Sequence, residues 1–394
     1  MNALDGFDGF DGFDGFDGFG DAEDGRPHRR AGSQLATALT RSREGHLARP
    51  DQTPIKGGAQ STLEFAPALV QAWGRAGQQM PAMADPRLLA RMDSPFRRQL
   101  CVMDLMSTIG LCRLDKTASP VTVTFGALPV PFVRPELEAF KYQALRVESW
   151  AALRAERNAE ILAQMTAQFP FWTSVVGLRP YSMQSTYELM AVAIQVASNV
   201  VQHVKFAMCC PRPSDLSARV QPMIPVPGHF SWPSGHATQA FMMAELLSSL
   251  TVPAAGDEAA KGAWREMRAQ LWRQADRIAT NRVVAGLHYP IDGDAGCVLG
   301  TLLAVHIVNQ AVSTPWVPTL AKGSWPKLFN MLGQRDSDYL GIRKELSRFS
   351  FHSAQTGDAE SITLDTLRFS GAEGSPIQWL IHQAVREWTE LGVA

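Results

Sequence analysis

The sequence predicts an all-α protein, a helical bundle that follows a disordered N-terminal tail. After about residue 63, apolar residues recur with helical periodicity and Pro-rich breaks separate the periodic stretches. Only Val121–Phe125 alternates like a β-strand. We therefore expect helices over 63–76, 85–110, 135–168, 183–209, 236–251, 258–284, 292–313 and 376–391.

The first residues are of low complexity. Residues 5–19 are five tandem copies of Asp-Gly-Phe, followed by Gly/Asp-rich sequence. A three-residue period with a glycine in each copy fits neither a helix nor a strand. We expect residues 1–60 to form a disordered tail.

The amino-acid composition argues against a nucleic-acid partner and against a disulfide-rich protein. The 394 residues include 37 basic and 38 acidic ones, so the strong basic excess of a nucleic-acid-binding protein is missing. Five cysteines are too few and too scattered for a disulfide framework, and no Cys/His spacing indicates a zinc site. Adjacent Cys209 and Cys210 are expected to be reduced, helix-buried thiols.

No secretory signal is recognised at the N-terminus, because no basic stretch precedes an apolar one. The most apolar stretches, Tyr187–Met208 and Ala295–Val312, are interrupted by polar and charged side chains. A bilayer tolerates such interruptions poorly. We therefore expect no membrane span and a soluble, cytoplasmic protein. The number of subunits stays open, and a homo-oligomer is compatible with the sequence.

Three short segments carry hydrogen-bond donors within apolar sequence. In the first, Lys205 and Arg212 are seven residues apart, or two helical turns, so we expect both to project from one helix face. Pro211 and Pro213 then end the helix. The alternative is a pair of cations that extend to solvent at a helix end.

The second segment is Pro233-Ser234-Gly235-His236. Pro233 can open a helix, which puts the next three residues at its N-terminus, where free N–H groups and the helix dipole favour an anion. The Ser234 hydroxyl adds a donor, and Gly235 lets an oxyanion approach the main chain. The alternative is an ordinary N-cap and turn.

The third segment runs from Arg282 to Asp292. Gly286 allows a tight exit from a helix, and His288 follows on the turn. Asp292 is close enough in sequence to accept a hydrogen bond from His288, which would fix its tautomer. A structural His–Asp pair is the alternative.

Taken together, the three segments supply what a trianionic tetrahedral oxyanion needs. Three cations offset about three negative charges, and arginine forks suit oxyanion geometry. One imidazole can bond the central atom while the second acts as a general acid and base.

The pattern Lys205-x6-Arg212-Pro213, Pro233-Ser-Gly-His236 and Arg282-x5-His288-x3-Asp292 resembles the signature of the type-2 phosphatidic acid phosphatase (PAP2)/vanadium haloperoxidase superfamily. The resemblance implies a helical bundle of the vanadium haloperoxidase/acid phosphatase type with its core over 135–313. Residues 61–134 would form an N-terminal helical extension, and 314–394 a C-terminal extension packing on the core.

By this resemblance, Lys205, Arg212 and Arg282 bind the equatorial oxygens of the oxyanion. Ser234 and Gly235 add hydrogen bonds.

The resemblance gives the remaining residues catalytic roles. His288 is the axial ligand of vanadate or, in a phosphatase, the nucleophile that becomes a phosphohistidine. His236 is the acid–base group, and Asp292 orients His288. In the haloperoxidases, vanadate is the cofactor, and hydrogen peroxide, a halide and a small organic substrate are the partners.

The sequence around the second segment favours a haloperoxidase. His229-Phe-Ser-Trp-Pro-Ser-Gly-His-Ala-Thr is similar to the corresponding stretch of vanadium bromoperoxidases, in which the first histidine lies near the vanadate. His229 is therefore expected to tune peroxide activation or halide choice, with bromide as the halide. Phe230 and Trp232 are expected to wall the pocket, or else to pack in the core.

Two alternatives stay open. Only 21 residues separate Arg212 from Ser234, which is short for a large haloperoxidase, and the His288–Asp292 stretch is also found in phosphatases. A soluble acid phosphatase would bind phosphate and need no cofactor. A non-catalytic oxyanion-binding protein is the third reading, and it would need neither His236 nor Asp292.

Overall fold

The computed structural model describes residues 82–112, 114, 121–165, 168–253, 257–313, 316–319, 350–353, 369–371 and 373–392. The helices and strands among these residues belong to one compact unit whose described part begins at Asp85. The helices are η1 (Pro86–Arg91), α3 (Ser94–Ser107), α4 (Leu137–Trp150), η2 (Ala151–Leu153), α5 (Arg154–Ala163), α6 (Phe169–Val176), α7 (Gln184–Met208), α8 (Pro213–Leu216), α9 (Gly235–Leu250), α10 (Glu258–Val284), α11 (Pro290–Asn309) and α14 (Pro376–Glu390).

The predicted helical class is confirmed, with differences at the breaks. The helix expected over 85–110 is divided, because Met92 and Asp93 are extended and Pro95 opens α3. The helix expected over 135–168 is interrupted by the 3₁₀ turn η2, and α6 was not predicted. The tail over 1–60 and the helix over 63–76 lie outside the described residues.

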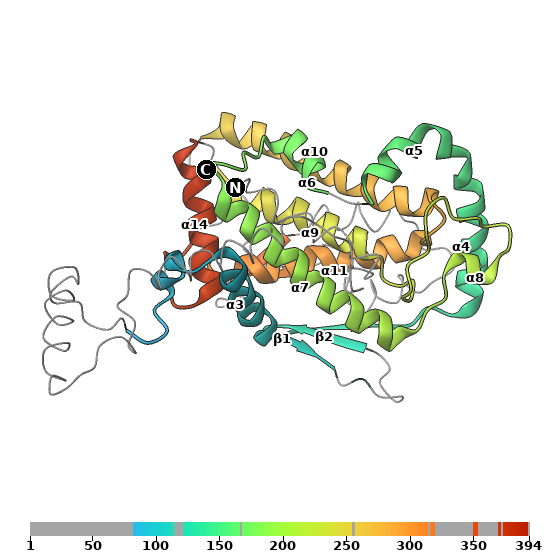
Figure 1. The fold of residues 1–394 in the computed structure, drawn as a ribbon, viewed down its shortest axis with the longest axis horizontal. Coiled ribbons are helices and arrows are strands. Elements are labelled where there is room, and N and C mark those ends of the chain that lie inside the picture. Colours follow the sequence, from blue (N-terminus) through green and yellow to red (C-terminus); the bar gives the residue numbers. More distant parts are fainter. Residues whose placement is uncertain are drawn as a thin grey trace, which may run out of the picture. The chain divides into compact units, whose positions relative to one another are not determined.

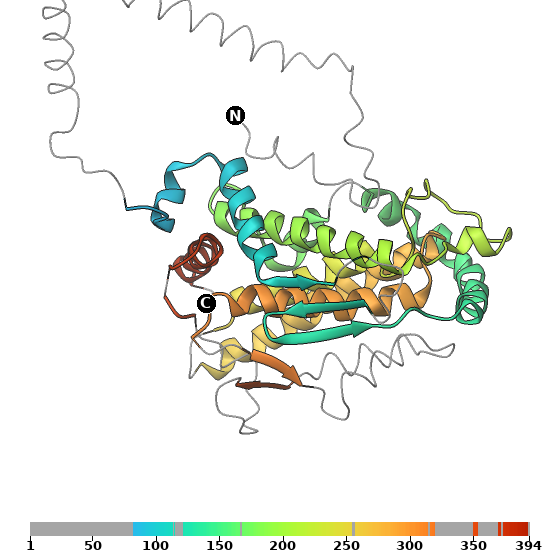
Figure 2. The ribbon, with the colours of Figure 1, turned by 90° about the horizontal axis from the view of Figure 1, so that it is seen from below.

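A small antiparallel sheet accompanies the helices. It has the order β1 (Ile109–Leu111), β2 (Val121–Phe125) and β3 (Leu128–Phe132), and Figure 2 shows it beside α7 and α11. The predicted strand is confirmed as β2. Its neighbour β3 was missed because Pro129 and Pro131 argue against a strand, yet β3 is an edge strand, where proline is tolerated. A second pair, β4 (Trp316–Thr319) and β5 (Ser350–Ser353), lies in the C-terminal part.

Helix α9 forms the centre of the bundle. All of its residues are buried, and it packs against α10, α11 and α7, as Figure 1 shows. Helix α11 is buried from Pro290 to Val308. Helices that are buried all round lack an amphipathic stripe, and they read as nearly uniform apolar sequence.

Glycine allows α9 and α11 to approach closely. A Cβ built on Gly300 would overlap the carbonyl oxygen of Thr238 and lie 2.9 Å from the nitrogen of Met242. A Cβ on Gly296 would lie 2.8 Å from the carbonyl oxygen of Ser234. The backbones of the two helices are therefore in direct contact, which brings their N-termini side by side.

The C-terminal helix α14 packs against α7 and α3. Its Glu387 carboxylate accepts hydrogen bonds from the backbone N–H groups of Ser185 and Thr186, at 2.7 and 2.8 Å. These groups lie in the first turn of α7, where an anion also complements the helix dipole. The far end of the chain thus caps the helix that carries Lys205.

By length and composition, α11 could cross a membrane, since its mean hydropathy is 1.5. The sequence predicts that the overlapping stretch Ala295–Val312 is too interrupted by polar side chains to form a span. All of the hydropathy window of α11 is buried, however, and the core helix of a globular protein passes the same test. No other helix among the described residues meets this criterion.

Burial of His306 on α11 makes stability depend on pH. The ring lies 5.7 Å from that of Phe125, and Nε2 is 2.8 Å from the Thr108 hydroxyl oxygen. The same nitrogen lies 3.4 Å from the side-chain amide nitrogen of Gln310. Burial lowers the pKa of His306 from 6.5 to about 4.

We expect His306→Gln to make the free energy of unfolding depend less on pH between pH 6.5 and 4. The unfolded chain takes up a proton below pH 6.5 while the folded protein resists until about pH 4. The wild type should therefore lose up to about 3 kcal/mol across this window through His306, and the variant should not. Urea unfolding at pH 7, 5.5 and 4 measures the difference; parallel curves for the two proteins would contradict it.

We expect Gly300→Ala to destabilise the protein by about 1–3 kcal/mol or more, because the new methyl group meets backbone atoms that cannot move aside. Gly262→Ala is the matched control. It lies within α10 with nothing within 4 Å of a built Cβ, so helix propensity alone should leave stability unchanged or raise it slightly. Equal melting temperatures for the two variants would argue against the close contact.

Candidate active site

The N-terminus of α9 is built as the sequence predicts. Ser234 is the N-cap, and its Oγ accepts a hydrogen bond from the Ala237 N–H at 3.3 Å. A capping hydroxyl that accepts in this way keeps its own hydrogen for another acceptor. Gly235 is the first residue of the helix and His236 the second. All three residues are buried.

His288 and Asp292 form a buried pair at the start of α11. Gly286 has a φ of 84° and makes the turn that the sequence predicts between α10 and α11. The Nδ1 atom of His288 lies 2.8 Å from Oδ2 of Asp292. Because a carboxylate only accepts, Nδ1 carries the hydrogen, and Nε2 of the neutral ring keeps its lone pair.

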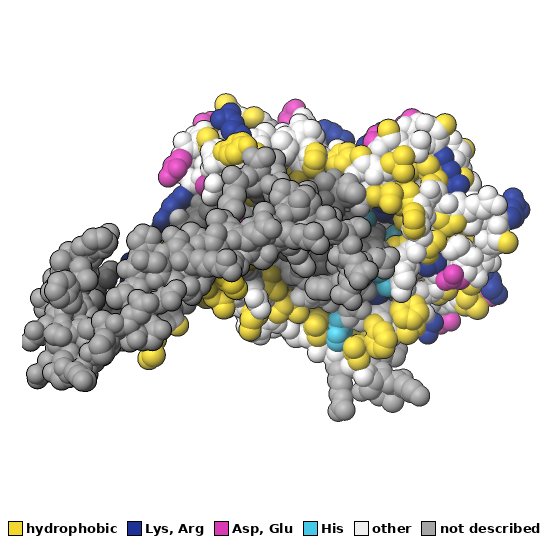
Figure 3. All heavy atoms as spheres, viewed as in Figure 1, with side chains coloured by type: hydrophobic (Ala, Val, Ile, Leu, Met, Phe, Trp, Pro, Cys, Tyr) yellow, Lys and Arg dark blue, Asp and Glu magenta, His cyan; other side chains and the backbone are white. Residues whose placement is uncertain are grey.

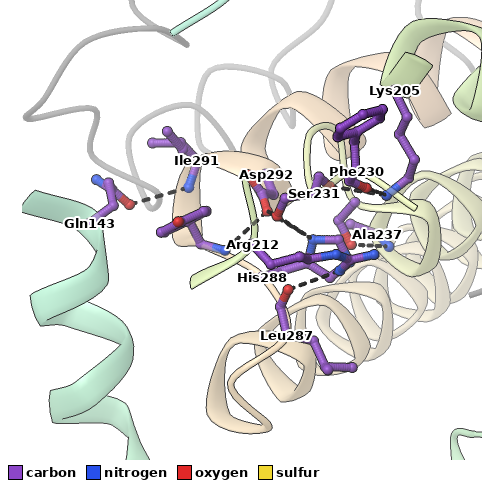
Figure 4. Close-up of polar contacts among 12 residues, drawn as sticks. Gln143, Lys205, Arg212, Phe230, Ser231, Ala237, Leu287, His288, Ile291 and Asp292 are labelled. Atoms are coloured by element: carbon purple, nitrogen blue, oxygen red, sulfur yellow. Dashed lines mark hydrogen bonds and ion pairs between the residues drawn. The ribbon is translucent and has the colours of Figure 1, made fainter. Parts of the chain in front are cut away.

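Arg212 reinforces this tautomer from the opposite side. Its Nη1 lies 3.1 Å from Nε2 of His288 and also donates to the Leu287 carbonyl at 2.9 Å (Figure 4). Its Nη2 lies 3.1 Å from Nδ1 of His229, and its Nε donates to the His229 carbonyl. Since a guanidinium only donates, Nε2 of His288 is an acceptor. Nδ1 of His229 lies equally close to the Phe230 carbonyl, which only accepts, so its contacts do not fix the position of the ring hydrogen.

Lys205 reaches the same region by a different route from the one predicted. Helix α7 ends at Met208, Cys209 has a φ of 47°, and Arg212 is the extended N-cap of α8. The expectation that Lys205 and Arg212 share one helix face is therefore wrong, because a left-handed residue separates them. Lys205 Nζ donates instead to the carbonyls of Phe230 and Ser231, at 2.8 and 3.0 Å.

The adjacent cysteines also differ from expectation. Cys209 and Cys210 are free thiols, as predicted, but both lie past the end of α7. Cys209 is exposed and only Cys210 is buried.

Ser231 belongs to the site, although the sequence reading did not single it out. It is fully buried, and its hydroxyl donates to Oδ2 of Asp292 (Figure 4). Its backbone carbonyl accepts from Lys205. Its position three residues before Ser234 is the one feature of the sequence that could have indicated its place in the site.

Burial and hydrogen bonding have opposite effects on the pKa of the Asp292 carboxyl. Burial raises its pKa to about 6. The hydrogen bonds from Ser231 and from the Tyr289 N–H act in the opposite direction, as do the charges of Lys205 and Arg212. At neutral pH the group is ionised, so it can hold the His288 proton on Nδ1.

Arg282 and His236 form a second group around Gln164, the residue that follows α5. Arg282 Nη2 donates to the Ile161 carbonyl at 3.1 Å and lies 3.3 Å from Oε1 of Gln164. The Nε2 atom of His236 donates to the Gln164 carbonyl at 3.0 Å. No sequence motif includes Gln164, because it lies 118 residues from Arg282 along the chain.

The two groups are joined through the backbone at the helix N-termini. The Ser234 N–H donates to the Asp292 carbonyl at 2.9 Å, and the Leu287 N–H donates to the Arg282 carbonyl at 3.1 Å. His229 is half-buried and Phe230 is 38% exposed, so both lie at the rim. Trp232 is buried and packs edge-on against Phe132 at 5.8 Å, as a core residue does.

The donor set fits an oxyanion. The side chains of Lys205, Arg212 and Arg282 are each no more than 3% exposed, and the acceptors described above are carbonyls, an amide and neutral imidazoles. Such acceptors satisfy N–H groups without cancelling the charge, so a ligand with several negative charges complements them. Among the described residues, no group of three His, Cys, Asp or Glu side chains could hold a metal cation.

Comparison with known families gives a match. Residues 187–315 match the PAP2 superfamily model. Members of that superfamily are generally enzymes, either phosphatases or haloperoxidases, and the match does not separate the two branches. The segment contains every site residue that the sequence predicts, whereas Gln164 lies outside it. No curated protein matches the chain.

We expect Asp292→Asn to weaken orthovanadate binding and turnover by about 10- to 100-fold, because an amide cannot hold the His288 proton as a carboxylate does. Asp215→Asn is the matched control. Asp215 is exposed and accepts from the Arg212 backbone N–H at 2.7 Å without touching His288. Equilibrium dialysis with orthovanadate compares the two, and equal losses would show that Asp292 has no special role.

Proposed function

We propose that this protein is a vanadium-dependent haloperoxidase that oxidises a halide, with bromide as the first candidate. The observation that carries the proposal is the contact between His229 and Arg212, with Nδ1 and Nη2 3.1 Å apart. It puts an additional half-buried imidazole against an oxyanion-binding guanidinium. A histidine at this position is the feature in which the chain resembles the bromoperoxidases.

The residues of this site fit vanadate in charge and in hydrogen-bonding capacity. Lys205, Arg212 and Arg282 would bind its oxygens, and the Nε2 lone pair of His288 would hold its central atom. The Ser234 hydroxyl and the Gly235 N–H would add hydrogen bonds. When bound, vanadate would supply the activation of hydrogen peroxide for transfer of an oxygen to the halide.

His236 is suited to move a proton at Nδ1. Its Nε2–H is held by the Gln164 carbonyl, which leaves Nδ1 as the atom that gains and loses the proton.

Apolar side chains at the surface suit a small organic substrate. Leu162 and Met165, on either side of Gln164 in sequence, are 49% and 37% exposed. Phe230 is exposed to a similar degree. Figure 3 shows hydrophobic side chains gathered over the end of the molecule where α4, α5 and α8 lie. An apolar acceptor of electrophilic halogen could bind there.

A phosphatase is the second candidate, because the tautomer of His288 also suits a nucleophile. Nε2 would attack the phosphorus of a phosphoester while the bond to the leaving oxygen breaks, and His236 would protonate that oxygen. Water would then release phosphate from His288. The contact that fixes the hydrogen on Nδ1 serves either reaction equally.

Peroxide-dependent bromination, assayed beside phosphoester hydrolysis, tests the proposal. We expect the purified protein to brominate only after orthovanadate is added and to be inhibited by phosphate. Hydrolysis without vanadate, inhibited by vanadate, would replace this proposal with the phosphatase.

Two variants complete that assay. His288→Ala should lose activity in either reaction. His236→Ala should still bind orthovanadate but lose turnover by about 100-fold or more. Unchanged turnover of the second variant would remove His236 from the mechanism.

A further inference from the structure

Gln164, which directly follows α5, contacts two residues of the site although no sequence motif includes it. It is 1% exposed. Its side-chain oxygen faces Arg282, and its backbone carbonyl accepts from His236. A single residue therefore touches both the oxyanion-binding arginine and the acid–base histidine.

The orientation of the Gln164 amide is fixed by its neighbour Asn281. Arg157 Nη1 donates to Oδ1 of Asn281 at 3.2 Å, and Nδ2 of Asn281 donates to the Glu160 carboxylate at 3.1 Å. These obligate partners settle which end of the Asn281 amide is the nitrogen. The same Nδ2 lies 3.0 Å from Gln164, so the atom facing it must be the oxygen.

The oxygen of Gln164 is consequently directed at Arg282. Turning the amide over would put its NH₂ group against two donors, Asn281 Nδ2 and Arg282 Nη2. The other acceptor of Nη2 is the Ile161 carbonyl, also on α5. Arg282 is thus held in place by α5, while its own backbone belongs to α10.

An ion pair anchors this arrangement. Glu160 accepts from Arg277 Nε at 2.7 Å, and that hydrogen bond is the main reason that the pKa of Glu160 is lowered. Glu160 stays ionised, so it continues to accept from Asn281. The chain of contacts from Arg277 through Glu160 and Asn281 to Gln164 keeps α5 and α10 in register beside the site.

We propose that Gln164 is a positioning residue of the oxyanion site. Its side-chain oxygen holds the Arg282 guanidinium in the orientation in which it binds the oxyanion, and its backbone carbonyl keeps a proton on Nε2 of His236. The inference rests on the proposed function only in requiring that Arg282 binds an oxyanion; it applies equally to vanadate and to phosphate.

Gln164→Leu tests the side-chain contact because it keeps the volume and the backbone carbonyl. We expect orthovanadate to bind about tenfold more weakly, since Arg282 loses an acceptor that orients it. Turnover at saturating orthovanadate, or kcat for a phosphoester, should stay within about threefold, because the carbonyl that holds His236 remains. A merely structural role would not separate affinity from turnover in this way.

Gln168→Leu is the matched control. Gln168 is also a buried glutamine after α5, but its Nε2 donates to Gln239 at 3.3 Å. This variant should bind orthovanadate as the wild type does. A double-mutant cycle with Arg282→Ala adds a second criterion, because Gln164→Leu should have no further effect on affinity once Arg282 is gone.

The outcomes distinguish this inference from the proposed function. Unchanged affinity in Gln164→Leu, an equal loss in Gln168→Leu, or additive losses in the double mutant would each overturn the role of Gln164 alone. A wild-type protein that binds neither orthovanadate nor inorganic phosphate would overturn the oxyanion site itself, and this inference with it. Circular dichroism and urea unfolding establish that each variant is folded.

Discussion

The backbone contact between α9 and α11 is the constraint on which the site depends. Without side chains at Gly296 and Gly300, the two helices approach until Cβ atoms would collide with the opposite backbone. Their N-termini then lie together, and the Ser234 N–H bonds to the Asp292 carbonyl. This contact brings the first N–H groups of one helix, which have no acceptors within the helix itself, beside the His288–Asp292 pair of the other.

The cations and the imidazoles have different roles in the site, and their hydrogen bonds determine these roles. The hydrogen bonds of the cations described above go to carbonyls, an amide and imidazoles, while the charges of Lys205 and Arg212 also act on the Asp292 carboxyl and lower its pKa. The tautomer of His288 follows from its two partners, because Arg212 can only donate and Asp292 can only accept. For Nε2 of His288 to bind an oxyanion, Arg212 Nη1 must release it, while the hydrogen bond from Nδ1 to Asp292 stays in place.

The sequence predicts the parts of the site that depend on local geometry. A helix N-terminus at Ser234 and a His–Asp pair four residues apart both follow from short-range rules, and the structure has both. The prediction that Lys205 and Arg212 lie on one helix face is wrong, because Cys209 adopts a left-handed conformation that periodicity does not reveal. Gln164 was missed for a different reason, since its contacts are made across 72 and 118 residues and depend on how α5 packs.

Helix α5 matters because the sequence motifs do not determine the direction in which the Arg282 side chain points. A motif specifies that an arginine is present at position 282, but a guanidinium on a long flexible side chain can point in many directions. Its direction is set by acceptors on another helix, the Ile161 carbonyl and the Gln164 amide, and their position depends in turn on Asn281 and Glu160. Holding the charged groups is a requirement that vanadate and phosphate share. Under the proposed function, the distinction between the two chemistries falls instead to residues at the rim of the site, where His229 is half-buried and Phe230 is exposed.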